Sequence, residues 1–286
     1  MDVKERHRNN LLTLAIQAAL AAGKEILKVY GRSDFEVELK SDNSPLTLAD
    51  RIAHQTITEI LASATIPLLS EESVSIPFRE RKAWKTFWLV DPLDGTKEFI
   101  RRNGEFTVNI ALIENHSPTK GVIYVPVLDE LYAGDVQHGA WKITSASAVA
   151  PADMLISGVA TRLPVNHNSS PGIVASRSHL NPETSAFVEG MKRKYPDARI
   201  VSRGSSLKLC MIAEGSAGIY PRFAPTSEWD TAAGHAIVVA SGGKVLLAAN
   251  NDQSLRYNKE NILNPWFIAL SQNIQQTWYE HKNNNA

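Results

Sequence analysis

The chain has 286 residues, of which 30 are Lys or Arg and 30 are Asp or Glu, so its formal net charge is zero. This balance argues against a large nucleic-acid surface, and 43% hydrophobic with 21% charged residues excludes a disordered or fibrous chain. The length suits two domains or one large one, while the single cysteine, Cys210, excludes an intramolecular disulfide and is consistent with a reducing compartment.

The first predicted element is an amphipathic helix of about five turns that ends near Gly31. The basic residues Lys4, Arg6 and Arg8 before the apolar stretch 11–22 resemble a signal peptide, but the apolar periodicity continues beyond that stretch. The residues on the apolar face are Leu12, Ile16, Ala19, Gly23, Ile26, Leu27 and Tyr30. The segment is too short and too interrupted to span a membrane, so we expect a cytoplasmic protein.

A strand and a second helix follow. Residues 35–40 alternate in polarity as a strand would, and a polar loop comes after them. Thr47 is a plausible N-cap for a helix that runs to about Ala62. Asp50 lies in the first turn of this helix, where an acid usually does no more than interact with the helix dipole.

The apolar stretch 87–90 predicts a buried strand that is followed by two acids, Asp91 and Asp94. Pro92 should stop the strand ladder because it has no N–H, and Gly95 lets the chain turn. Two desolvated acids this close repel each other, so a cation between them would stabilise the turn, and oxygen ligands indicate Mg²⁺. The alternative is a solvated turn, which is the commoner fate of such a sequence.

A second short apolar strand, residues 66–70, also ends in acids, Glu71 and Glu72. If it is the parallel neighbour of the strand at 87–90, Glu71 converges with the acids of that strand at one edge of a sheet. The carboxyl ends of strands are where open α/β sheets usually bind ligands. The alternative is that the two adjacent acids begin a solvated loop.

The middle of the chain predicts a change of architecture. Residues 106–143 form a series of strands separated by turn signals, which is typical of an antiparallel meander. Residues 145–171 are rich in Ser, Pro, Ala and Asn, and we place a domain boundary there. The expected domains are an α+β unit at 1–155 and an α/β unit at 156–286.

The second half alternates strands and helices, as an α/β unit does. The predicted strands cover 172–175, 199–202 and 217–220. One predicted helix covers 182–195, and the segment 204–208 opens another that runs to about Glu214. The Gly-Ser-Ser-Leu-Lys sequence at 204–208 offers free N–H groups, hydroxyls and a charge to an anion, although Ser-rich helix starts usually only cap themselves.

A further helix is predicted from Glu228 to about Ser241. Asp230 lies in its first turn, where an acid is often only a cap. The Ala and Gly residues that follow would let this helix approach another backbone closely, as a site at a helix end requires.

Three motifs together resemble the signature of the lithium-sensitive, magnesium-dependent phosphomonoesterases. This superfamily includes inositol monophosphatases, bisphosphate nucleotidases and fructose-bisphosphatases. The motifs are Glu71-Glu72, Asp91-Pro-Leu-Asp94-Gly-Thr96 and Trp229-Asp230-Thr-Ala-Ala-Gly234, in the order and spacing of that family. The resemblance extends over nearly the whole chain and implies an α/β fold, a layered α/β/α/β/α sandwich.

The resemblance also implies roles for individual residues. The metal ligands would be Glu71, Asp91, Asp94, Asp230 and the carbonyl of Leu93, around two to three Mg²⁺ ions. Thr96, with Asp50 or Glu72, would orient and deprotonate the attacking water. The substrate-binding residues would be Glu71, Asp94, Gly95, Thr96, His179, Ser205, Lys208, Arg222 and Asp230; of these, His179, Ser205, Lys208 and Arg222 would contact a nucleotide.

The stretch from 88 to 112, with 204–208 and 220–223, is most similar to bacterial 3'(2'),5'-bisphosphate nucleotidases of the CysQ type. The implied reaction is hydrolysis of 3'-phosphoadenosine 5'-phosphate to AMP and phosphate in sulfate assimilation, with 3'-phosphoadenylyl sulfate as a further substrate. We expect a small nucleotide partner, no nucleic-acid polymer, and at most peripheral contact with the inner face of the bacterial membrane. The alternatives are an inositol-phosphate phosphatase and a catalytically silent sensor that binds metal or nucleotide.

Overall fold

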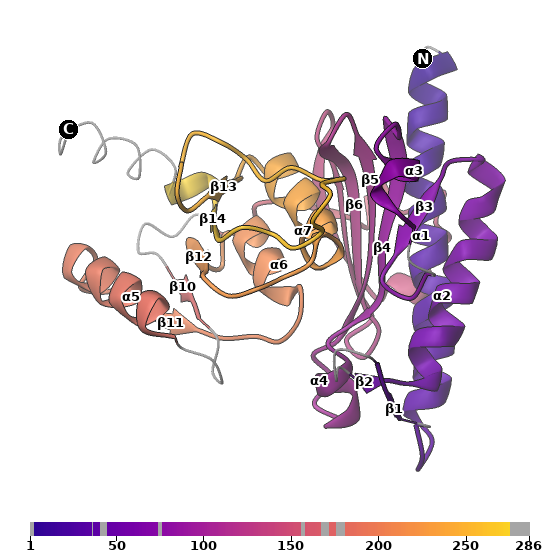
Figure 1. Ribbon diagram of the computed structural model, residues 1–286, viewed down its shortest axis with the longest axis horizontal. Helices are drawn as coiled ribbons and strands as arrows, with labels where there is room; N and C mark the ends of the chain where they lie inside the picture. Colours follow the sequence, from indigo (N-terminus) through magenta and orange to yellow (C-terminus); the bar gives the residue numbers. More distant parts are fainter. Residues whose placement is uncertain are drawn as a thin grey trace.

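The computed structural model describes residues 3–35, 37–40, 45–73, 76–155, 158–166, 172–175 and 181–274. These residues form five layers (Figure 1). The helical layers are α1 (Val3–Tyr30) with α2 (Leu48–Leu61), then α6 (Leu207–Glu214) with α7 (Glu228–Ala240), then α5 (Pro182–Lys194), and a sheet lies in each of the two gaps between them. The predicted α/β sandwich is confirmed.

The larger sheet has seven strands in the order β3-β4-β5-β6-β7-β8-β9. They are β3 (Leu68–Ser70), β4 (Thr86–Asp94), β5 (Thr107–Glu114), β6 (Ser117–Val125), β7 (Glu130–Asp135), β8 (Gly139–Thr144) and β9 (Thr161–Arg162). The β3–β4 pair is parallel and the other pairs are antiparallel, so both the meander and the parallel neighbours were predicted correctly. The division into domains at 1–155 and 156–286 stays a prediction.

One prediction about β4 was wrong, because Pro92 does not end the strand. Asp91 pairs with Asn109, and after a register shift Asp94 pairs with Thr107. Pro92 lies inside this irregular step, where the ladder does not require its missing N–H. The strand therefore continues to Asp94, and Gly95, with φ of 94°, makes the turn.

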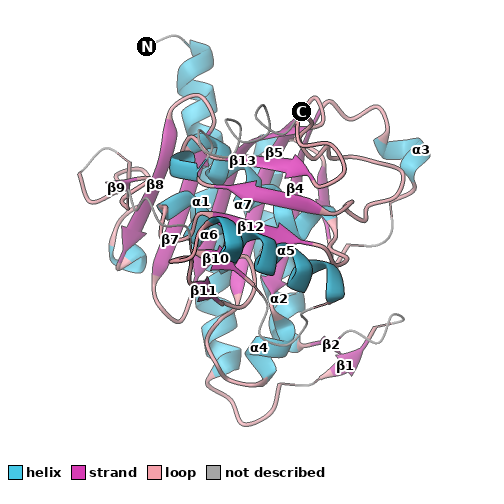
Figure 2. Cartoon of the chain, turned by 90° about the vertical axis from the view of Figure 1, so that its left-hand side faces the viewer, coloured by secondary structure: helices cyan, strands magenta, loops and turns pink. Residues whose placement is uncertain are grey.

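The smaller sheet has the order β11-β10-β12-β14-β13. Its strands are β10 (Ile173–Val174), β11 (Ile200–Val201), β12 (Ile219–Arg222), β13 (Lys244–Leu247) and β14 (Phe267–Leu270). The last two had not been predicted, since short apolar stretches such as β14 carry no periodic signal of their own. Figure 2 views the molecule from the side of the smaller sheet, so that this sheet and α5 lie in front of α7 and the larger sheet.

The remaining elements are short. They are β1 (Glu38–Leu39), β2 (Pro45–Leu46), η1 (Ala62–Ala64), α3 (Phe78–Arg81), α4 (Thr96–Ile100) and η2 (Ala146–Ala148). The strand predicted at 35–40 is thus reduced to two residues that pair with β2.

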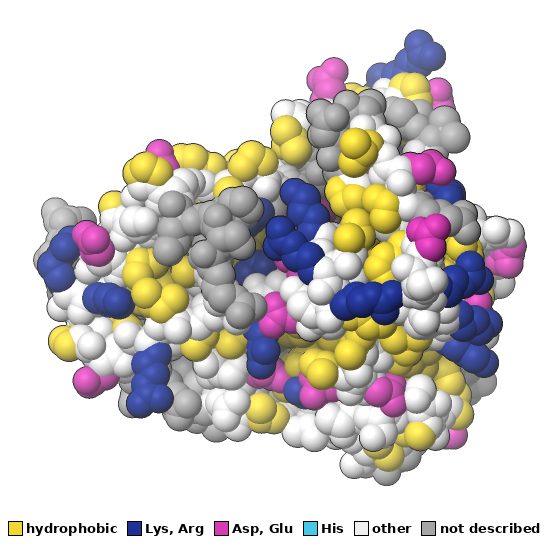
Figure 3. Space-filling model, turned by 90° about the horizontal axis from the view of Figure 1, so that it is seen from below, with side chains coloured by type: hydrophobic (Ala, Val, Ile, Leu, Met, Phe, Trp, Pro, Cys, Tyr) yellow, Lys and Arg dark blue, Asp and Glu magenta, His cyan; other side chains and the backbone are white. Residues whose placement is uncertain are grey.

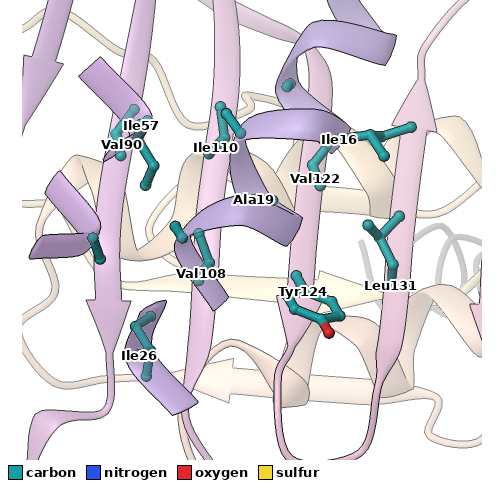
Figure 4. Packing of buried hydrophobic residues seen from close by; sticks show 14 of the residues in the cluster. Ile16, Ala19, Ile26, Ile57, Val90, Val108, Ile110, Val122, Tyr124 and Leu131 are labelled. Carbon is teal, nitrogen blue, oxygen red and sulfur yellow. The ribbon is translucent and has the colours of Figure 1, made fainter. Parts of the chain in front are cut away.

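Three buried clusters hold the layers together. In the first, Ile16, Ala19 and Ile26 of α1 cover the larger sheet (Figure 4). Leu27 was expected on this apolar face but is 37% exposed. On the opposite face of the sheet, α7 passes so close that a Cβ at Gly121 would lie 2.2 Å from the carbonyl oxygen of Ala233. The small residues of α7 therefore serve a close approach, as predicted.

His235 of α7 makes folding stability depend on pH. It is buried with Nδ1 2.9 Å from the hydroxyl of Tyr257, and burial lowers the pKa of His235 from 6.5 to about 3. Below pH 6.5 the unfolded chain therefore binds a proton that the folded chain does not. We expect the free energy of unfolding to fall with pH in this window, by up to about 1.4 kcal/mol per pH unit from this group.

Urea denaturation of the wild type and of His235→Gln between pH 7 and pH 4 tests this expectation, because the variant lacks the titrating group. The wild type should lose stability more steeply than the variant as the pH falls. Parallel curves would contradict the assignment.

Candidate active site

The ends of β3 and β4 bring the predicted acids together. Ser70 is in register with Val90, and the backbone N–H of Glu71 donates to the carbonyl of Val90 at 3.1 Å. Glu71 and Asp91 therefore lie side by side at one edge of the sheet, and α7 adds Asp230 from the other half of the chain. One oxygen from each of these three carboxylates lies within 4.8 Å of the others.

The electrostatics of this cluster are unfavourable for bare carboxylates. Burial, followed by the charges of Glu71 and Asp94, raises the pKa of Asp91 well above its usual range. Burial also raises the pKa of Glu71, and burial with the charge of Asp94 raises that of Asp230 to about 7. Each of these shifts expresses the free-energy cost of holding negative charges together away from water.

This donor set fits a divalent cation. Hard carboxylate oxygens are what Mg²⁺ prefers, and a cation offsets both the desolvation and the repulsion. Asp91 is only 1% exposed, which distinguishes the cluster from ordinary solvated acids. The individual ligand roles, including that of the Leu93 carbonyl, stay predictions.

Asp94 is held by donors from the second half of the chain. Its Oδ2 accepts hydrogen bonds from Ser205 Oγ at 2.6 Å, from Ser206 Oγ at 2.7 Å and from Asn109 Nδ2 at 3.4 Å. The sequence suggested these hydroxyls for an anion, with self-capping as the commoner alternative, and in the structure both contact Asp94 Oδ2. A nucleotide contact by Ser205 stays a prediction.

Asp50 and Thr96 form the pair that the resemblance predicted for activating water. Thr96 Oγ1 lies 3.2 Å from Asp50 Oδ1 and 3.4 Å from the carbonyl oxygen of Leu93. Asp50 also accepts hydrogen bonds from the backbone N–H and hydroxyl of Thr47, so it caps α2 as well. Burial raises the pKa of Asp50, which makes it a better proton acceptor.

Glu72, the other candidate partner of Thr96, has a different contact. Lys40 Nζ forms ion pairs with Glu72 and, at 2.8 Å, with Glu71. Burial raises the pKa of Glu72, and the hydrogen bond from Lys40 opposes that shift. Lys40 was missed by the sequence analysis, and no local signal could have found it, since it precedes a polar loop 31 residues before Glu71.

A pocket of about 190 Å³ adjoins the carboxylates, and its lining includes Asp94, Asp230, Lys208 and Arg222. Lys208 Nζ donates to the carbonyls of Arg203 and Ser205 at 3.1 and 2.8 Å, and burial lowers the pKa of Lys208. Gly95 and Ser205 line the same pocket. From below, basic and acidic side chains gather where the two halves of the molecule meet (Figure 3).

His179, the remaining predicted contact, lies outside the described residues. The other eight predicted substrate-binding residues are all described, and each lies at the carboxylate cluster, in the pocket or in contact with one of them. Ser206 and Asn109 also contact Asp94 and were not predicted as site residues.

Comparison with known proteins gives the family. The model of the "Inositol monophosphatase family" matches residues 7–282. The chain belongs to the inositol monophosphatase family. Members of this family depend on metal ions, in agreement with the acidic cluster at the ends of β3 and β4.

Three informative relatives within the family are all named CysQ. The 3'(2'),5'-bisphosphate nucleotidase CysQ of Salmonella typhimurium is 44% identical over 261 residues, which cover 90% of this chain and 98% of that protein. Its counterpart in Buchnera aphidicola is 45% identical and covers 82% of this chain and 83% of its own length. The crystal structure of CysQ from Bacteroides thetaiotaomicron shares 49% identity with a TM-score of 0.84, covering 92% and 98% of the two chains.

In the part of the chain that the structure describes, no helix is both long enough and apolar enough to cross a membrane. Peripheral contact with a membrane stays a prediction.

Proposed function

We propose that this chain is a magnesium-dependent, lithium-sensitive 3'(2'),5'-bisphosphate nucleotidase that converts 3'-phosphoadenosine 5'-phosphate to AMP and phosphate. The observation that carries the proposal is that one pocket joins a carboxylate cluster to two cationic side chains, Lys208 and Arg222. The similarity to CysQ proteins over 90% of the chain supports the same substrate. 3'-Phosphoadenylyl sulfate would fit in the same way.

The carboxylates of Glu71, Asp91, Asp94 and Asp230 would hold two to three Mg²⁺ ions. Bound Mg²⁺ supplies a water of lowered pKa and neutralises charge on the phosphoryl group and the leaving oxygen. Thr96 would orient the attacking water. Its hydroxyl donates to Asp50 Oδ1, so Thr96 would accept a proton from the water and pass its own proton to Asp50. Glu72 is less suited to this role because Lys40 already pairs with it.

The second phosphate of the substrate would bind to Lys208 and Arg222. The planar guanidinium of Arg222 suits a phosphate because it can donate two parallel hydrogen bonds. One terminal nitrogen of Arg222 donates to the carbonyl of Pro225 at 3.1 Å, which holds the guanidinium at the pocket that it lines. A nucleotide that carries two phosphates is thereby distinguished from one that carries a single phosphate.

The proposed biological setting is sulfate assimilation, in which the nucleotide product must be removed. The partner is then a small molecule and not a nucleic-acid polymer. The zero net charge of the chain agrees with this, because it argues against a large nucleic-acid surface.

Replacing Arg222 by methionine should separate the bisphosphate from a monophosphate substrate. We expect the KM for 3'-phosphoadenosine 5'-phosphate to rise about 10- to 100-fold, the cost of losing a charged hydrogen bond. Hydrolysis of inositol 1-phosphate should stay unchanged because it has no second phosphate. Steady-state kinetics on both substrates measure this, and Arg199→Met, at an exposed arginine of the same half, is the matched control.

Phosphate release with Mg²⁺, with and without lithium, compares this nucleotide with inositol 1-phosphate and fructose 1,6-bisphosphate. Dominant, lithium-inhibited hydrolysis of the nucleotide supports the proposal. A preference for inositol phosphate would favour an inositol-phosphate phosphatase with the same metal site. Tight binding of Mg²⁺ and nucleotide without turnover would instead indicate a sensor.

A further inference from the structure

The hydroxyl of Ser206 lies at the junction of the two halves of the active site. Its Oγ is 2.7 Å from Asp94 Oδ2, at the end of β4, and 3.0 Å from the carbonyl oxygen of Asp230, in the first turn of α7. Asn109 Nδ2, from β5, donates to the same Oγ at 2.9 Å. One side chain thus contacts two predicted metal ligands that come from different halves of the chain.

The hydrogen bonds around Ser206 leave it little freedom. The hydroxyl has one proton, which it can donate to Asp94 Oδ2 or to the carbonyl of Asp230. Its oxygen accepts a hydrogen bond from the side-chain amide of Asn109. Ser206 is only 4% exposed, so water does not compete for these contacts. As the N-cap of α6, it would ordinarily bond to the first turn of its own helix, but its side chain makes no such bond.

The conformation of the loop before Ser206 places the Ser206 hydroxyl at this position. Ser205 adopts a left-handed conformation with φ of 51°, which costs free energy for a residue with a side chain. Glu105 Oε2 accepts a hydrogen bond from the backbone N–H of Gly204 at 2.8 Å, which fixes the start of the loop. The hydroxyl of Ser205, like that of Ser206, then reaches Asp94 Oδ2.

The donors from Ser205, Ser206 and Asn109 all meet the same oxygen of Asp94. Oδ1 of Asp94 accepts no hydrogen bond from any of these three donors and is therefore the oxygen left for a cation. Since hydrogen bonds to a ligating carboxylate fix its orientation, this arrangement sets which way Asp94 faces.

We propose that Ser206 is a positioning residue that joins Asp94 to the first turn of α7 and so holds the two halves of the metal site at the spacing a divalent cation requires. The inference rests on the proposed function, because it assigns to Asp94 and Asp230 the role of metal ligands. It predicts that loss of the hydroxyl weakens metal binding and leaves recognition of the nucleotide by Lys208 and Arg222 intact.

The test is the dissociation constant for Mg²⁺, measured by calorimetry and by the Mg²⁺-dependent rise in Tm, for the wild type, Ser206→Ala and Ser206→Thr. We expect the alanine variant to bind Mg²⁺ about 10- to 100-fold more weakly, in the range found for residues that orient metal ligands. Threonine keeps the hydroxyl and should restore the affinity. The KM for the nucleotide at saturating Mg²⁺ should stay within about twofold in both variants.

Ser216→Ala is the matched control, because Ser216 lies just beyond the other end of α6 and bonds to the carbonyl of Met211 and to Glu214. If Ser206→Ala lowers the Tm in EDTA but keeps the wild-type affinity for Mg²⁺, the role is only structural and the proposal is overturned. Should the alanine variant fail to fold, Ser206→Cys, which keeps the size but is a weaker donor, decides between the same outcomes. A wild type that neither binds Mg²⁺ nor hydrolyses the nucleotide would instead overturn the proposed function.

Discussion

Asp91→Asn should lower the turnover of 3'-phosphoadenosine 5'-phosphate by on the order of 10³-fold or more while the protein stays folded. Asp91 is the most deeply buried acid of the cluster, and a neutral amide is a far weaker ligand for Mg²⁺. The amide oxygen can still accept the backbone N–H of Leu93, which donates to Asp91 Oδ1 at 3.1 Å. The local turn is therefore preserved.

The same substitution should not reduce stability in EDTA. The raised pKa of Asp91 means that its charge is unfavourable in the folded state, so removing the charge relieves repulsion from Glu71 and Asp94. We expect an equal or higher Tm in EDTA and a much smaller rise in Tm on adding Mg²⁺. Asp153→Asn, at an exposed acid, is the control. A wild-type response to Mg²⁺ in Asp91→Asn would contradict the metal assignment.

Thr96→Val should reduce kcat by about 10²- to 10³-fold with little change in KM, as expected for a group that acts on a proton in the transition state. Valine keeps the shape of threonine but removes the hydroxyl that lies 3.2 Å from Asp50 Oδ1. Initial rates over a range of substrate concentrations at saturating Mg²⁺ measure both constants.

Thr96→Ser is the matched variant, because it restores the hydroxyl and should recover most of the activity. Retention of near-wild-type kcat by the valine variant would show that the water is activated without this side chain. In that case the hydrogen bond from Thr96 to Asp50 stabilises the local structure and does not transfer a proton.

The N-termini of α2 and α7 illustrate how far local signals extend. Thr47 was predicted as an N-cap and is one, and Asp230 was recognised as a possible cap at the start of its helix. Both predictions depend on residues within one helical turn of each other. The same short range explains why Asp50 and Asp230, which are real capping residues, gave no sign from spacing alone that they also lie at the active site.

The smaller sheet shows where local signals fail. β14 lies between β12 and β13 and is antiparallel to both, yet it has only four residues and its residues are buried on both faces. A strand of this kind has no alternation of polarity, so its position depends on the neighbours that it meets. Pro92 was misjudged for a related reason, because the shift in register that tolerates it belongs to the pairing of β4 with β5.

The sequence by itself determined most of the helices, the strands of the larger sheet, the family motifs and the fact that two strands end in carboxylates, since these depend on neighbouring residues. Only the tertiary structure decided the partner of each carboxylate: Lys40 for Glu72, Thr96 for Asp50, and Ser205 and Ser206 for Asp94. Ser206 and Asp94 are 112 residues apart in sequence. Contacts over such separations arise when the layers pack, because burial forces each polar group to find whichever donor or acceptor the fold has placed beside it.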